Sequence, residues 1–216
     1  MEIKVMKNIM YANERLAREN RKFFRENRIT AVNVMASPGA GKTSIILKVI
    51  ENLKNELGIS VIEGDIASSI DAEKIDRLGI PVVQINTCGG CHLDANMIME
   101  AAKGISFKGN SLLFIENVGN LVCPSTFDLG EEIKMLIASV PEGHDKPYKY
   151  ISMFDAADVV VLNKTDTLSC IDFDMDAFYK GVRALNTRAP IFPVSCRTGE
   201  GLGDFLEWLR EKAGGK

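Results

Sequence analysis

Apolar residues along the chain gather in short continuous runs, separated by stretches with helical periodicity. The runs predict strands at 31–35, 60–62, 82–85, 112–115, 135–140, 159–162 and 191–194. Between several of them, apolar residues recur at helical spacing, which predicts helices over 44–57, 94–102, 173–185 and 202–212. Apolar strands that alternate with helices are typical of a mostly parallel sheet covered by helices on both faces. The pattern therefore predicts an α/β fold.

The first 28 residues have a different pattern, which predicts a helix that precedes the sheet. Residues 13–28 contain six basic residues and three Glu but no Gly or Pro. Met10, Leu16, Phe23 and Phe24 give this stretch a broken apolar stripe. We expect an amphipathic helix packed on the domain, with docking to another protein as the alternative. We therefore predict two parts, an N-terminal helical segment at 1–28 and a domain at 29–216. Within the domain, the polar stretch 141–148 is predicted to be a mobile loop.

Composition narrows the classes of protein. The 216 residues are 46% hydrophobic and 25% charged, as in an ordinary globular domain, and the net charge of −3 argues against a nucleic-acid partner. The five Cys are unevenly spaced and no signal-peptide pattern precedes them, so we expect a cytoplasmic protein without a disulfide framework. No apolar run approaches the roughly 18 residues of a membrane span, so no membrane partner is expected.

A phosphate-binding loop is predicted directly after the first strand. Residues 37–44 read SPGAGKTS and fit the pattern GxxxxGK[ST], except that Ala36 stands in place of the first Gly. In this pattern backbone N–H groups surround the phosphate oxygens, while Lys42 reaches the β- and γ-phosphates and Thr43 offers a hydroxyl to Mg²⁺. The candidate nucleotide-binding residues of the loop are Pro38, Gly39, Ala40, Gly41, Lys42, Thr43 and Ser44.

Two predicted strands run into acidic residues that suit Mg²⁺. Glu116 and Gly119 form an ExxG arrangement where P-loop NTPases normally have DxxG, and the Gly119 N–H could bind a γ-phosphate. Asp65 is a candidate for Mg²⁺ coordination or for positioning the attacking water, with Asp71 as the weaker rival. The predicted catalytic residues are Lys42, Asp65 and Glu116, and the predicted magnesium ligands are Thr43, Asp65 and Glu116.

The motif after the run 159–162 predicts a preference for guanine. Residues 163–166 read NKTD, and the carboxylate of Asp166 can accept hydrogen bonds from guanine N1–H and N2–H₂, a donor pair that adenine lacks. Lys164 would lie along the base, and Asn163 would tie this loop to the phosphate loop. The turn after the last strand is expected to donate backbone N–H groups to guanine O6 and to cover the base with its arginine; its candidates are Ser195, Cys196 and Arg197.

A second constellation consists of cysteine and histidine. Cys91 and His92 follow the third predicted strand, and Cys123 lies four residues after Gly119. Two thiols and an imidazole suit Zn²⁺ or Ni²⁺, and the short distance to Gly119 would couple metal binding to nucleotide state. Adjacent residues bind one ion only on a turn, so two ions or a site completed by a second subunit remain open. One alternative is that these cysteines are buried structural thiols. The other is covalent haem attachment, because Cys88, Cys91 and His92 form a CxxCH motif.

Several segments together resemble the nickel-incorporation GTPases of the HypB family. They are SPGAGKT (37–43), GDIASSIDAEKI (64–75), CHLDA (91–95), ENVGNLVCP (116–124), DLGE (128–131) and NKTD (163–166). CHLDA and ENVGNLVCP are more specific than the nucleotide motifs, and they point away from the related urease accessory GTPases, the nearest alternative. The resemblance implies a P-loop NTPase fold, with 29–216 as a GTPase domain that contains an embedded metal site.

The resemblance also implies a function in [NiFe]-hydrogenase maturation. The chain would bind and hydrolyse GTP and form a nucleotide-dependent homodimer with metal at Cys91, His92 and Cys123, at or near the subunit interface. It would deliver Ni²⁺ to a hydrogenase large-subunit precursor with a small nickel metallochaperone. Residues 1–30 lack the Cys or His of a metal store. With no obvious activating arginine, we expect slow turnover, on the order of 10⁻³ to 10⁻² s⁻¹. The alternatives are a P-loop kinase and a metal-binding regulatory protein with little turnover.

Overall fold

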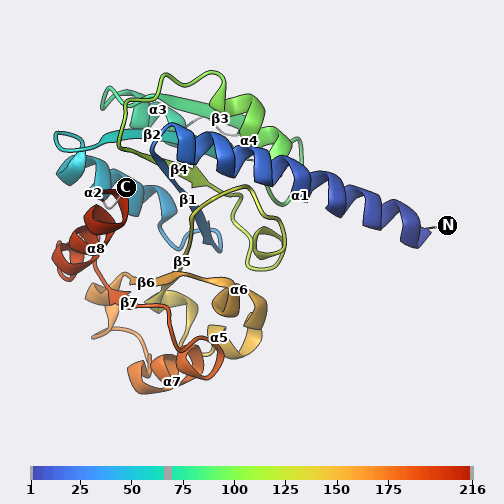
Figure 1. Cartoon of the computed structure of the whole chain (residues 1–216). Helices are drawn as coiled ribbons and strands as arrows, with labels where there is room; N and C mark the ends of the chain where they lie inside the picture. Colours follow the sequence, from blue (N-terminus) through green and yellow to red (C-terminus); the bar gives the residue numbers. More distant parts are fainter. Residues whose placement is uncertain (1, 66–69, 215–216) are drawn as a thin grey trace.

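A parallel sheet organises the chain in this computed structural model (Figure 1), which describes residues 2–65 and 70–214, with side chains from residue 11 onward. Part of the predicted GDIASSIDAEKI segment, residues 66–69, lies outside the described residues. The described strands form one seven-stranded sheet in the order β3-β2-β4-β1-β5-β6-β7, and every pairing is parallel. Their bounds are β1 (Ile29–Ala36), β2 (Gly58–Asp65), β3 (Val82–Asn86), β4 (Ser111–Glu116), β5 (Ile133–Ser139), β6 (Val159–Asn163) and β7 (Ile191–Pro193).

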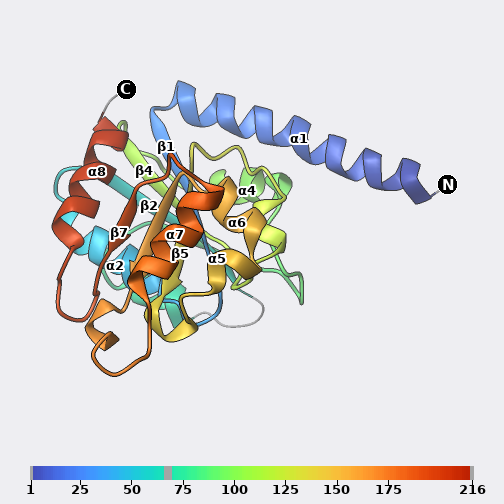
Figure 2. The same ribbon diagram turned by 90° about the horizontal axis from the view of Figure 1, so that it is seen from below.

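Helices cover both faces of the sheet, as Figures 1 and 2 show. One face packs against α2 (Lys42–Leu53), α3 (Ile70–Asp76) and α8 (Leu202–Gly214). The other face packs against α1 (Glu2–Glu26) and α4 (Ala95–Ala102) at one end, and against α6 (Ile151–Ala156) and α7 (Met175–Leu185) at the other. The predicted fold class is therefore confirmed, including the helix that precedes the sheet.

Alternation along the strands decides which face each residue meets. In β1, Val32 and Val34 join the core beneath α2, whereas Ile29 and Ala31 join the core beneath α1 and α4. All four side chains are almost fully buried, so both faces of the central strand carry apolar residues. Polar residues at the carboxyl ends of the strands follow the same alternation, and neighbours in sequence there serve opposite faces.

The stretch 141–148, which was predicted to be a mobile loop, has local structure. It contains a 3₁₀ turn, η2 (Val140–Glu142), and a short helix, α5 (Lys146–Lys149). The carboxylate of Glu142 accepts hydrogen bonds from the hydroxyls of Ser37 and Ser139, so this segment is tied to the start of the phosphate loop. The polar composition suggested a loop because the sequence does not reveal the contact with Ser37, which lies 105 residues earlier in the chain.

The N-terminal helix packs on the sheet through a face that differs from the predicted stripe. Phe24 is buried and Ala17 is fully buried, but Phe23 is 41% exposed and touches Phe107 only edge-on. The side chains of Asn13 and Asn20 are buried instead. Figures 1 and 2 both show the first half of α1 extending beyond the body of the molecule. The side chain of Met10, predicted as part of the stripe, lies outside the described part. Among the described residues, no helix is long and apolar enough to cross a membrane.

Candidate functional site

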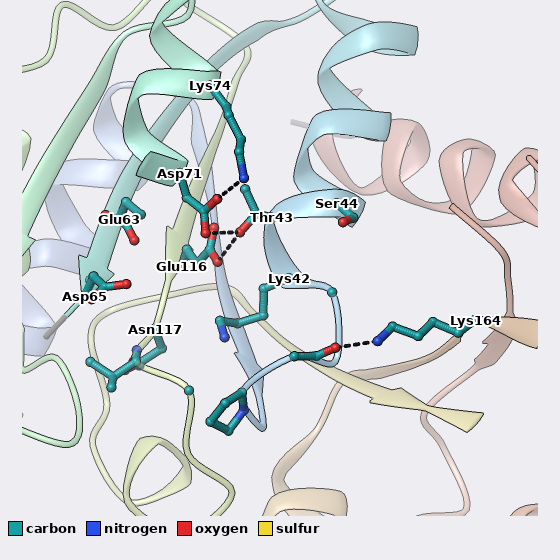
Figure 3. A pocket seen from close by; sticks show the side chains of 16 residues that line it. Lys42, Thr43, Ser44, Glu63, Asp65, Asp71, Lys74, Glu116, Asn117 and Lys164 are labelled. Atoms are coloured by element: carbon teal, nitrogen blue, oxygen red, sulfur yellow. Dashed lines mark hydrogen bonds and ion pairs between the residues drawn. The ribbon is translucent and has the colours of Figure 1, made fainter. Parts of the chain in front are cut away.

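A cavity of about 510 Å³ opens at the carboxyl ends of the central strands (Figure 3). Its position agrees with the rule that open parallel sheets bind ligands at this edge. The cavity brings together the phosphate loop, the acids at the ends of β2 and β4, and the first turn of α3. The lining residues are Pro38, Gly39, Gly41, Lys42, Thr43, Ser44, Glu63, Gly64, Asp65, Asp71, Lys74, Glu116, Asn117, Val118, Gly119 and Lys164.

The phosphate loop joins the end of β1 to the start of α2. Gly39 and Gly41 have φ values of 78° and 104°, a region that side chains disfavour. A Cβ on Gly41 would lie 2.4 Å from the side-chain nitrogen of Asn163, so glycine is required there on two grounds. Ala36, which replaces the usual first Gly, is the last residue of β1 and is fully buried in the core. The departure from the usual pattern therefore falls in a strand, and α2 begins directly at Lys42.

Thr43 lies between two carboxylates in the cavity. Its hydroxyl oxygen is 2.8 Å from Oε1 of Glu116 and 3.0 Å from Oδ2 of Asp71, and Asp71 is held in turn by Lys74 at 2.6 Å (Figure 3). Asp65 is the last residue of β2 and lines the same cavity. Both acids considered from the sequence are therefore present, and Asp71, the weaker rival, is the one that meets Thr43.

Glu63 is a further acid of the site that the sequence analysis did not single out. It pairs in register with Glu116 across β2 and β4, so the two buried carboxyl groups point toward the α2 face together. Burial and the neighbouring Glu116 carboxylate raise the pKa of Glu63 to about 8. Burial raises the pKa of Glu116 to about 7, although Lys42 and the Thr43 hydroxyl lower it. The sequence offered one signal for Glu63, because an acidic residue there directly follows the apolar run Val61-Ile62.

The oxygen atoms at this end of the cavity fit Mg²⁺. Among the described residues, Oε2 of Glu116 and Oε2 of Glu63 are buried without a hydrogen-bond partner. A divalent cation would satisfy such atoms, and Mg²⁺ prefers carboxylate, hydroxyl and water oxygens in this kind of setting. Thr43, Glu116 and one of the two aspartates could therefore hold the ion, and a bound cation would lower the pKa of each carboxyl group that it contacts.

The two raised pKa values predict that the nucleotide-free, Mg²⁺-free protein loses stability as the pH rises. Glutamate in the unfolded chain ionises near 4.5, whereas folded Glu63 keeps its proton up to about pH 8. The folded state thus binds more protons than the unfolded state between these values, so the free energy of unfolding decreases across this window. Urea unfolding in EDTA at pH 5.5 and pH 8 should show the decrease, and Glu63→Gln should reduce it. A wild-type stability that rises over this range would contradict the prediction.

The NKTD motif lies beside the phosphate loop and contacts it twice. The Asn163 side chain donates to the carbonyl of Ala40 at 3.0 Å, and the Lys164 ammonium donates to the carbonyl of Gly39 at 2.6 Å. Lys164 has a φ of 63°, which aims its side chain back along the loop. A second cavity of about 440 Å³ adjoins this motif. It is lined by Ser44, Leu47, Lys48, Glu51, Asn163, Lys164, Asp166, Thr167, Cys196 and Arg197.

The carboxylate of Asp166 contacts two side chains of the turn after β7. The Ser195 hydroxyl donates to Oδ1 at 2.7 Å, and the guanidinium of Arg197 lies 3.2 Å from Oδ2. The Ser195 backbone N–H, a candidate donor to guanine O6, donates to the carbonyl of Glu200 in this structure. The Cys196 N–H makes only a long bond of 3.4 Å to Asn163. Arg197 lies on the carboxylate that was assigned to the base, rather than over an open base site.

The predicted metal ligands form one cluster, on the segments that follow β3 and β4. The sulfur of Cys91 lies 3.0 Å from the sulfur of Cys123 and 3.5 Å from Nδ1 of His92, and the three donor atoms lie within 4.8 Å of one another. Partial burial lowers the pKa of His92, which favours the neutral, metal-binding imidazole. The ring of His92 stacks on Phe127 with centroids 3.8 Å apart. Adjacent residues thus converge on one point, which favours a single ion over two.

One segment, residues 116–123, connects the cavity with the cysteine and histidine cluster. Glu116 faces the cavity, and the next residue, Asn117, also lines it and hydrogen-bonds to the loop that carries Cys91 and His92. Its side-chain oxygen accepts the N–H groups of Leu93 at 3.1 Å and Val118 at 3.0 Å. At Gly119 a Cβ would lie 3.0 to 3.1 Å from Pro38 of the phosphate loop. Asn117 was missed from the sequence because its partner, Leu93, lies 24 residues away.

Comparison with known proteins agrees with this arrangement. Residues 30–193 match the family described as CobW/HypB/UreG, nucleotide-binding domain. Hydrogenase maturation factor HypB of Rhizobium leguminosarum bv. viciae is 47% identical over 211 residues, which cover 98% of this chain and 71% of that protein. The crystal structure of HypB from Archaeoglobus fulgidus has a TM-score of 0.88 at 39% identity, covering 94% of this chain and 99% of that one.

A second solved structure, HypB from Helicobacter pylori in complex with nickel, gives the same TM-score of 0.88 at 34% identity, over 94% of this chain and 96% of that one. The family match over residues 30–193 spans the sheet, the phosphate loop and the segments that contain the cysteine and histidine cluster. The predicted family and P-loop fold are therefore confirmed. The chain belongs to the HypB family of hydrogenase maturation factors, within the CobW/HypB/UreG group of nucleotide-binding domains.

Proposed function

We propose that this protein is a GTPase that binds Ni²⁺ or Zn²⁺ at Cys91, His92 and Cys123 and delivers nickel during [NiFe]-hydrogenase maturation. The observation that carries the proposal is the segment 116–123, which begins in the phosphate cavity and ends in the three-donor cluster. The nickel complex of the Helicobacter pylori relative supports nickel as the metal, and in this proposal nickel is the cargo rather than a resident cofactor. The client is a hydrogenase large-subunit precursor, and a small nickel metallochaperone is the partner.

The phosphate end of the nucleotide occupies the 510 Å³ cavity in this proposal. Backbone N–H groups between Gly39 and Ser44 surround the phosphates, and the ammonium of Lys42 neutralises charge on the transferred γ-phosphoryl group. Thr43, Glu116 and Asp65 would hold Mg²⁺, which would neutralise further charge on the phosphate oxygens. Asp65 also orients the attacking water, and Asp71 takes this role if Asp65 only coordinates the ion.

The guanine base lies in the neighbouring 440 Å³ cavity, with Asp166 as the selective residue. Its carboxylate accepts two hydrogen bonds from the N1–H and N2–H₂ groups of guanine. Arg197 leaves Asp166 when the base binds, since both occupy the same carboxylate. Asn163 and Lys164 hold the NKTD loop against the phosphate loop, so the positions of the base site and the phosphate site are fixed relative to each other.

Nucleotide state and metal binding are coupled through Asn117 and Cys123. A γ-phosphate bound by the Gly119 N–H shifts the segment between residues 116 and 123. Asn117 transmits this shift to the metal loop, because its side chain holds the N–H of Leu93, the neighbour of His92. Cys123 moves with the same segment. A homodimer that forms in the GTP state places the cluster, with its exposed Cys91, at or near the subunit interface.

The test is the oligomeric state, measured by light scattering with GDP and with a non-hydrolysable GTP analogue, each with and without Ni²⁺ or Zn²⁺. We expect the GTP analogue to favour a dimer and metal to change the equilibrium in the wild type but not in Cys91→Ala. Cys170→Ala, which removes another exposed thiol outside the cluster, is the matched control. Equal metal affinity in the GDP and GTP-analogue states would refute the coupling. Nucleotide binding without turnover would instead identify a regulatory protein.

A further inference from the structure

Two buried asparagines of α1 connect the segments that supply the metal ligands. Asn13 accepts the N–H of Ala95 at 2.9 Å and donates to the carbonyl of Asp128 at 2.9 Å. Asn20 donates to the carbonyl of Ala95 at 2.8 Å and to the carbonyl of Leu129 at 2.9 Å. Asn13 and Asn20 are only 9% and 3% exposed, so these bonds are shielded from water. Each asparagine therefore bridges the same two segments of main chain.

Both segments lead directly to the cysteine and histidine cluster. Ala95 begins α4, three residues after His92, and the carboxylate of Asp94 fixes this helix start by accepting the N–H of Met97 at 2.8 Å. Asp128 lies five residues after Cys123, and its neighbour Phe127 is the ring on which His92 stacks. The positions that α1 holds are thus one short stretch away from the ligands on both sides.

The contact between α1 and the Cys123 segment is further restricted at Asp128 and Gly130. The guanidinium of Arg21 lies 2.7 Å from Oδ1 of Asp128. Gly130 has a φ of 88°, and a Cβ there would lie 2.6 Å from the carbonyl oxygen of Ala17. The turn after the cluster therefore approaches the backbone of α1 too closely for any side chain at this position.

We propose that α1 acts as a clamp on the metal site, with Asn13 and Asn20 as positioning residues that set the spacing between the Cys91–His92 segment and Cys123. Three donors bind an ion tightly only when their spacing is held in advance, because otherwise binding must also order the two segments. A conformation in which α1 is lifted from the sheet then has a lower metal affinity. The proposal rests on the metal site of the proposed function and adds the way in which its affinity is controlled.

The clamp also predicts an effect in the reverse direction. If docking of α1 raises the metal affinity, metal must strengthen the docking of α1 by the same factor. The first half of the helix extends away from the body (Figure 2), and the hydrogen bonds of Asn13 and Asn20 carry this coupling. The Ala95 N–H, which Asn13 holds, reports docking directly.

The experiment compares Ni²⁺ affinity in the wild type, Asn13→Ala and Asn20→Ala, followed by thiolate-to-nickel charge-transfer absorption in the full chain. We expect each variant to bind Ni²⁺ about 10- to 100-fold more weakly, as is usual when groups that orient ligands are removed. GDP affinity should stay unchanged. Asn186→Ala is the matched control: Asn186 is also a buried asparagine that bridges main chain, between Phe154 and Ala157, but in another part of the structure.

Loss of Ni²⁺ affinity in Asn186→Ala equal to that in the α1 variants would overturn the clamp, because the effect would then be general destabilisation. Unchanged affinity in Asn13→Ala and Asn20→Ala would overturn it as well. If these variants do not fold, hydrogen exchange of the wild type decides: Ni²⁺ should slow exchange at Ala95 in the wild type but not in Cys91→Ala, and an unchanged rate refutes the clamp. A wild type that binds neither Ni²⁺ nor Zn²⁺ would instead refute the proposed metal site.

Discussion

Replacing Lys42 by alanine is expected to reduce GTP hydrolysis at least about 100-fold, the scale of losing one preorganised charge-stabilising group at a transition state. Lys42 begins α2 and extends into the cavity in front of Glu116 (Figure 3), where the transferred phosphoryl group would lie. The variant also leaves the buried carboxyl groups of Glu63 and Glu116 without the nearby cation that lowers their pKa values. Phosphate release in single-turnover reactions measures the effect.

The control for Lys42→Ala is Lys103→Ala. Lys103 follows α4 and pairs with Glu100, and neither residue lines the phosphate cavity or the base cavity, so its loss should leave turnover within about twofold, as for exposed ion pairs of low energy. The metal cluster does not contact Lys42, and Ni²⁺ binding should therefore survive in both variants. Hydrolysis retained in a folded Lys42→Ala protein would overturn the assignment of the phosphate site.

Replacing Asp166 by asparagine should transfer the preference of the protein from guanine to xanthine nucleotides. The asparagine amide presents a donor where guanine also presents donors, so two hydrogen bonds to a charged acceptor are lost. Each such bond is worth about 1.5–3 kcal/mol, which predicts a loss of GDP affinity of about 100- to 10,000-fold. Xanthine carries a carbonyl in place of the guanine amino group and can accept from the new amide. Competition of GDP and XDP against a fluorescent nucleotide measures the exchange of preference.

The control for Asp166→Asn is Asp158→Asn. Asp158 precedes β6 and accepts the backbone N–H of Lys134 at the opposite end of the strand, so the same chemical change there should not alter the GDP to XDP ratio. A folded Asp166→Asn protein that still prefers GDP would show that the base lies elsewhere. The ratio of the two affinities, rather than either one alone, separates altered base selection from a general loss of binding.

Most of the fold could be predicted because each strand is apolar on both sides. Continuous runs such as 112–115 and 159–162 are too short for a typical helix but long enough for a strand, and the ends of the observed strands differ from the predicted ends by only a few residues. The short helices α3, α5 and α6 were missed. They have four to seven residues, too few to display a helical period, and their stability comes from contacts with distant segments.

Site residues were predictable where a motif is contiguous. Each of three motifs, the phosphate loop, NKTD and the Cys91–His92 pair, can be recognised within a few consecutive positions. The structure brings the residues of each motif together around a cavity or in the metal-ligand cluster. Glu63 and Asn117 act through partners on other elements, which spacing along the chain does not reveal. Asn13 and Asn20 were missed because the prediction for α1 assumed that its buried face would be apolar. The buried face instead contains these two amides, which hydrogen-bond to main-chain groups.

In the proposed base site, Arg197 competes with guanine for the carboxylate of Asp166. The guanidinium contacts the carboxylate that guanine needs; the arginine side chain is 82% exposed and the Asp166 side chain 11%, so water and salt screen the pair from the arginine side. A pair worth about 1 kcal/mol reduces nucleotide affinity about fivefold. Raising the ionic strength weakens the ion pair between Arg197 and Asp166. Guanosine carries no phosphate charges that salt could screen, so it should bind more tightly at high salt than at low salt.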